Sequence, residues 1–92
     1  MPNSVGAIMD VAVQTDEGIW IYEIKTGTSA RGCIREAIGQ LLEYALWPGA
    51  PKAAKLIVVG EGPFDDAAKA YLQRLNNRFP LPISYQQIAV TT

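Results

Sequence analysis

The first third of the chain carries apolar and polar residues in the order expected of a β-hairpin. Residues 5–14 alternate loosely and are rich in Val and Ile, and residues 19–25 are β-branched and aromatic, so both predict strands. The polar residues 15–18 between them, with a terminal glycine, predict the turn. Ser29 or Thr28 can cap a helix that follows the second strand.

The remaining two thirds of the chain alternate between helical and strand patterns. Apolar residues recur at helical spacing within 34–46, and Pro48 follows this stripe. The unbroken apolar run within 55–59 is typical of a central strand. A second helical stripe spans 65–78 and a final strand is predicted at 83–90.

The predicted order is therefore β-β-α-β-α-β within a single domain, residues 1–92. The two strands of a hairpin must be antiparallel, whereas each β-α-β step favours a right-handed crossover between parallel strands. We thus expect an α/β fold with a mixed, twisted β-sheet and helices packed on it.

Composition limits the classes of function. Of the 92 residues, 49% are hydrophobic and 18% are charged, as in a chain with an ordered core. The net charge of −1 is not that of a strongly basic nucleic-acid-binding protein. Histidine is absent and Cys33 is the only cysteine, which excludes histidine-based catalysis and a Cys/His zinc cluster. We find no apolar run of membrane-spanning length and no secretory signal, so we expect a cytoplasmic protein without membrane contact.

Three charged residues of the predicted hairpin are candidates for chemistry. Asp10 lies in the first strand, and Glu23 and Lys25 are two residues apart in the second, so the latter two share a face. If Asp10 lies on that face, two carboxylates and an ammonium converge. Together with the backbone carbonyl of Ile24, the carboxylates would form an all-oxygen site suited to Mg²⁺ or Mn²⁺.

The same three residues also fit an ordinary feature of a protein surface. Glu23 and Lys25 could form a solvated strand end with a cross-strand ion pair from Lys25 to Asp10, which would contribute under about 1 kcal/mol. From the hairpin residues by themselves, both interpretations stay open.

A larger set of residues resembles a known family. Asp10, then Glu23 and Lys25 in an E-x-K pattern, then Gln40 and Tyr44 in a Q-x-x-x-Y pattern, are similar to the motifs of the PD-(D/E)XK nuclease superfamily, in particular its RecB-like branch. The resemblance covers nearly all of the chain. It implies a restriction-endonuclease-like core in which Asp10 and Glu23 bind the metal ion, Lys25 assists the attacking water, and Gln40 contributes near the site.

The resemblance also implies a reaction and a substrate, namely hydrolysis of DNA phosphodiester bonds with Mg²⁺ or Mn²⁺. Arg35 and Arg31 are candidates for contacts with phosphates, although salt bridges to nearby glutamates are an alternative role. Gln40 and Tyr44 are one helical turn apart, so they either share a face with the chemistry or flank the apolar stripe.

One departure from the family pattern concerns the start of the chain. The family core is usually α-β-β-β-α-β, whereas only nine residues precede Asp10. We therefore expect a core truncated at its N-terminus, without the opening helix. Two consequences follow. The chain is either an active nuclease or a catalytically inactive interaction or DNA-binding module, and an uncovered sheet face or edge favours a homodimer.

Overall fold

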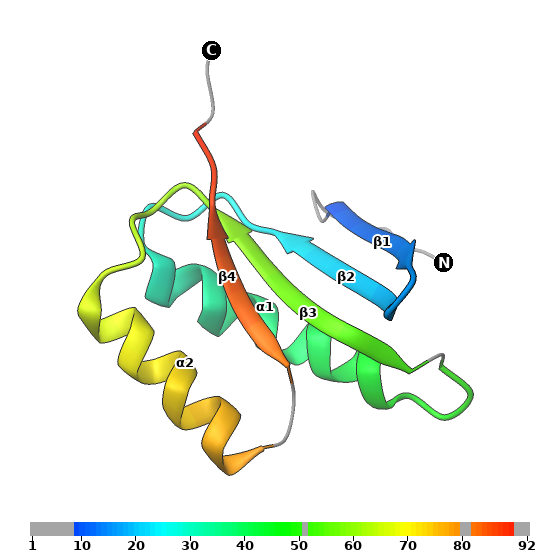
Figure 1. The fold of residues 1–92 in the computed structure, drawn as a ribbon. Coiled ribbons are helices and arrows are strands. Elements are labelled where there is room, and N and C mark those ends of the chain that lie inside the picture. The colour runs from blue at the N-terminus through cyan, green and yellow to red at the C-terminus, as the bar shows by residue number, and fades with distance from the viewer. Residues whose placement is uncertain (1–8, 51, 80–81, 90–92) are drawn as a thin grey trace.

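The computed structural model describes residues 9–50, 52–79 and 82–89, and for Met9 and Asp10 the backbone alone. These residues form four strands and two helices (Figure 1). In chain order they are β1 (Met9–Thr15), β2 (Gly18–Ile24), α1 (Ala30–Leu46), β3 (Ala53–Gly60), α2 (Asp66–Arg78) and β4 (Ile83–Gln87).

The strands form one mixed sheet in the order β1-β2-β3-β4. β1 and β2 are antiparallel, as a hairpin requires, whereas β2–β3 and β3–β4 are parallel. The predicted small α/β domain with a mixed sheet is thus confirmed. The apolar run of β3 is the reason for its central place, because Leu56 to Gly60 are all buried between two neighbouring strands.

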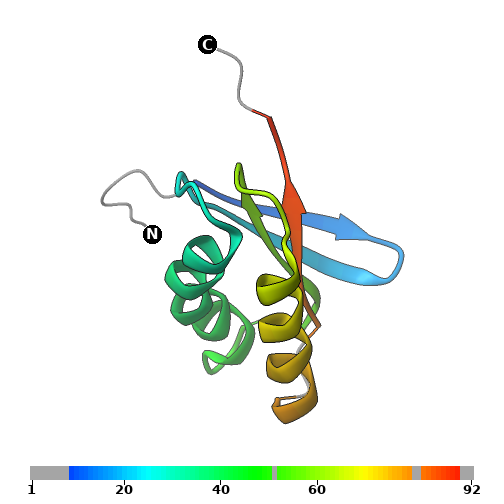
Figure 2. The same cartoon turned by 90° about the vertical axis from the view of Figure 1, so that its left-hand side faces the viewer.

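Both helices pack on the same face of the sheet, as the two views in Figures 1 and 2 show. The two crossovers, β2-α1-β3 and β3-α2-β4, step across the sheet in the same direction. Because both are expected to be right-handed crossovers, they place their helices on the same side of the sheet. Ile34 and Leu41 of α1, Leu72 of α2, and Leu56 and Val58 of β3 meet there in a single buried core. Neither helix of the described chain is long and apolar enough to cross a bilayer.

The ends of the elements differ from the predictions by a few residues. α1 begins at Ala30 rather than at 34, because the small residues Ala30 and Cys33 of its first turn are buried in the core without forming a strong apolar pattern. Ser29 is its N-cap, as predicted, and its Oγ accepts a hydrogen bond from the backbone N of Gly32 at 3.0 Å. Residues 5–8 and 90 of the predicted terminal strands lie outside the described part of the chain.

The loop after β3 packs directly against the start of α1. Gly62 is buried, and a Cβ atom at this position would lie 2.6 Å from the backbone O of Thr28 and 2.8 Å from the backbone N of Ala30. Both neighbours are backbone atoms, so neither can rotate away. The absence of a side chain at Gly62 therefore allows the loop to approach the first turn of α1.

We expect Gly62→Ala to lower the free energy of unfolding by about 1–3 kcal/mol, because an added methyl group overpacks this contact. Gly39→Ala is the matched control. It lies within α1 with nothing within 4 Å of an added Cβ, so the better helix former should raise stability by roughly 0.5–1 kcal/mol. Urea denaturation followed by circular dichroism measures both changes. A loss of similar size in the two variants would contradict the packing explanation.

Candidate active site

The candidate site is built around a carboxylate in the core. Glu23 is the penultimate residue of β2, and its exposed fraction is 0%. It is the one charged residue that is fully buried among the described side chains. A solvated strand end is therefore excluded. Burial of a carboxylate is costly unless charged or hydrogen-bonding groups surround it, so the residues around Glu23 must be considered together.

Lys25 connects this carboxylate to helix α1. Its Nζ lies 3.3 Å from Oε2 of Glu23 and donates a hydrogen bond to Oε1 of Gln40 at 2.7 Å. Its backbone N donates to the carbonyl of Val59 at 2.9 Å, which extends the parallel ladder just beyond the end of β2. The side chain is 13% exposed. The fold thus brings together the two ends of the E-x-K pattern and the glutamine fifteen positions later.

The register of the hairpin places Asp10 directly opposite Glu23. Positions directly opposite on antiparallel strands lie on the same face of a sheet. Ile24, whose carbonyl was a candidate metal ligand, pairs with Met9 on one side and Val59 on the other. Glu23 itself pairs with Val58, so the site lies where β1, β2 and β3 run side by side.

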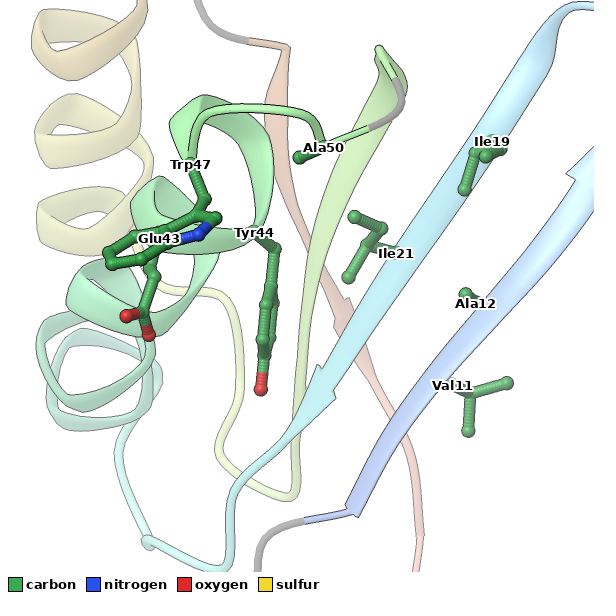
Figure 3. Close-up of a pocket in the computed structure, with 8 residues that line it drawn as sticks. All are labelled: Val11, Ala12, Ile19, Ile21, Glu43, Tyr44, Trp47 and Ala50. Carbon is green, nitrogen blue, oxygen red and sulfur yellow. The ribbon is translucent and has the colours of Figure 1, made fainter. Parts of the chain in front are cut away.

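Tyr44 lies one turn after Gln40 on α1 and borders a pocket beside the site. The pocket has a volume of about 520 Å³ and lies between the C-terminal end of α1 and the β1–β2 hairpin (Figure 3). Tyr44 and Trp47 line it from the helix side, and Ile19 and Ile21 line it from β2. Trp47 is 64% exposed, which makes it an uncovered aromatic surface next to this apolar wall.

The two candidate phosphate-binding arginines lie elsewhere on α1. Arg31 and Arg35 are exposed. With roughly 3.6 residues per turn, Arg31 is two and a half turns before Gln40 and therefore on the opposite side of the helix. Neither arginine therefore lies on the side of α1 that carries Gln40 and contacts Lys25.

Two acidic residues near the site were not selected from the sequence. Glu36 lies one turn before Gln40 on α1, and Glu61 follows the carboxyl end of β3. Both act electrostatically on the thiol of Cys33, as does Lys25. The spacing of Glu36 from Gln40 and the position of Glu61 after a predicted central strand were available signals, because adjacent parallel strands bring their carboxyl ends to one edge.

Cys33 is buried in the core below this group of charges. Its Sγ lies 3.6 Å from the carbonyl of Gly27. Burial is the largest effect on the thiol and raises its pKa above the ordinary value of 9.0. Cys33 is therefore a small buried residue of the core, and a thiol with a raised pKa is a poor nucleophile.

Comparisons with protein-family models, with curated proteins and with solved structures give no match. The site is therefore interpreted from its own chemistry. Glu23 supplies a buried anion, Lys25 a cation with donor hydrogens, and Gln40 an acceptor that fixes the direction of that cation. Such a set can hold a hard cation or stabilise negative charge that develops on a bound oxygen.

We expect Lys25→Met to lower the free energy of unfolding by about 3 kcal/mol, because it removes the ammonium beside a buried carboxylate. The double variant Glu23→Gln with Lys25→Met should recover most of this loss, since it removes both charges. Chemical denaturation of the two single variants and the double variant gives the coupling free energy. Additive losses would show that the two charges do not stabilise each other.

Alkaline pH should also destabilise the fold through Cys33. Its pKa is raised in the folded state, so the unfolded chain releases the thiol proton first and stability falls as pH rises above about 9. Melting temperatures between about pH 8 and pH 10 should therefore fall less for Cys33→Ala than for the native chain. Burial also raises the pKa of Tyr85 from 10.0, and the resulting loss at higher pH should occur in both proteins. Equal slopes from pH 8 to 10 would contradict the role of Cys33.

Proposed function

We propose that this chain is a divalent-metal-dependent nuclease domain of the PD-(D/E)XK type, with a restriction-endonuclease-like core, that hydrolyses DNA phosphodiester bonds. The observation that supports this most directly is the double contact of Lys25. Its Nζ meets the carboxylate of Glu23 and the amide oxygen of Gln40, which come from two separate sequence patterns. A nuclease needs this combination of an anion, a cation and a positioning group at one point.

The donor chemistry of the site fits a hard divalent cation. Asp10 and Glu23 are opposite each other in the register, and the carbonyl of Ile24 is a further oxygen donor. Oxygen ligands of this kind suit Mg²⁺ and Mn²⁺, and the fully buried Glu23 has a strong electrostatic reason to take up a cation. When bound, such an ion lowers the pKa of water and offsets charge on a phosphoryl oxygen.

Lys25 and Gln40 act as a pair in this proposal. The ammonium contacts Gln40 at 2.7 Å and Glu23 at 3.3 Å, so one of its three Nζ hydrogens remains for another partner. The carboxylate of Glu23 lies 3.3 Å from the ammonium, so the two opposite charges attract each other. Lys25 can therefore orient the attacking water or stabilise negative charge on the phosphate, while Gln40 is a positioning residue that holds the ammonium in place.

The remaining residues define how DNA would approach. Tyr44, at the border of the pocket next to the site, would contact nucleotides close to the scissile bond. Arg31 and Arg35 lie on other sides of α1 and would contact phosphates farther along the strand, where they add affinity without sequence preference. Because Arg31 and Arg35 do not share the helix face of Gln40, the cleavage position itself would depend on the metal ion and Lys25 for positive charge.

A second candidate function is a catalytically inactive interaction or DNA-binding module on the same fold. The contact between Lys25 and Glu23 favours it, because this ammonium already balances the buried carboxylate. Metal binding separates the two candidates.

We expect the native chain to cleave DNA in the presence of Mn²⁺ and to bind Mn²⁺ saturably in calorimetry. Glu23→Gln should abolish metal binding, and Lys25→Ala should lower the cleavage rate by about 10²–10³-fold through loss of charge stabilisation. Lys55→Ala is the matched control, because Lys55 is exposed and lies over the ring of Trp20 at 4.1 Å, away from the site. Undiminished cleavage by Glu23→Gln would overturn the nuclease proposal, and absent metal binding by the native chain would favour the inactive module.

A further inference from the structure

β1 forms one edge of the sheet within the described chain. It pairs with β2 along all seven of its residues, and no described strand lies on its other side. Such an edge presents a row of backbone N–H and C=O groups that can pair with another strand. The helices leave it open as well, since α1 packs against β2 and β3 rather than β1 (Figure 2).

From Val11 onward, the sequence of β1 lacks the features that commonly protect such an edge. From Val11 to Thr15 it has no charged residue and no proline, and its pairing with β2 has no bulge. Val11 and Val13 are 42% and 40% exposed. The opposite edge, β4, is different, because its exposed residues are polar and Pro82 precedes it.

We propose that a second copy of this chain pairs with β1 in antiparallel orientation, with the two-fold axis at Ala12. Ala12 is the midpoint of Met9–Thr15, so this register pairs all seven strand residues. Val11 of each copy is then opposite Val13 of the other copy, and the two Ala12 residues are opposite each other. The exposed valines are thereby covered, and the two four-stranded sheets become one continuous sheet.

Charge selects this register over its neighbour. With the axis at Ala12, Asp10 is opposite Gln14 of the second copy, so no two like charges face each other. With the axis at Val13, only the five strand residues from Val11 to Thr15 would pair, and Asp10 would approach Asp16 in the turn of the second copy, which is destabilising. With the axis at Val11, only five strand residues of β1 would pair.

One strand pair gives a small interface compared with the roughly 1,200–2,000 Å² of stable complexes. We therefore expect a reversible dimer with a micromolar dissociation constant. Analytical ultracentrifugation from low to high micromolar concentrations should show a monomer–dimer equilibrium. Val13→Lys should shift the equilibrium to the monomer, because a charged side chain would replace the valine that packs against Val11 of the second copy. Ser84→Lys, an equivalent change on the exposed part of β4, is the control and should leave the equilibrium unchanged.

A cysteine substitution tests the register directly. Cα atoms directly opposite on antiparallel strands are about 4.5–5.5 Å apart, within the range of a disulfide. Ala12→Cys should therefore form a disulfide-linked dimer under mild oxidation, whereas Gln14→Cys, opposite Asp10 of the second copy, should not. Cys33 is buried and should stay unlinked. A monomer at all concentrations, a dimer that Val13→Lys leaves intact, or equal cross-linking of the two cysteine variants would overturn the proposal.

Discussion

The buried carboxylate of Glu23 is the constraint on which the rest of the site depends. An anion with no exposure inside an apolar core requires compensating groups. Lys25, just beyond the end of the same strand, supplies a cation, and Gln40 attaches that cation to α1. The polar cluster therefore links the sheet to its main covering helix, and its cost to stability is the kind of cost that functional sites carry.

The placement of both helices on one face of the sheet affects both the core and the edge of the sheet. It builds a single core between the sheet and the helices, and it leaves β1 without helical cover. The site lies between these regions, where the hairpin extends beyond α1 and the pocket bordered by Tyr44 and Trp47 opens.

The sequence was a good guide to the site where its residues are close in chain position or share an element. The spacing of Glu23 and Lys25 placed them on one face, and helical geometry placed Tyr44 beside Gln40. It was a poor guide to the surroundings. The spacing of Glu36 and the position of Glu61 after β3 were signals for each residue separately, but their joint action with Lys25 on Cys33 depends on how α1 and the loop after β3 pack.

The sequence by itself determined the kinds of elements, because period-two and helical spacings arise from the backbone geometry of each segment. It also determined the antiparallel hairpin and the capping of α1 by Ser29, which involve neighbours in the chain. Only the tertiary structure decided that Glu23 is fully buried and that Lys25 reaches Gln40, because burial and contacts between distant residues depend on how the helix crosses the sheet.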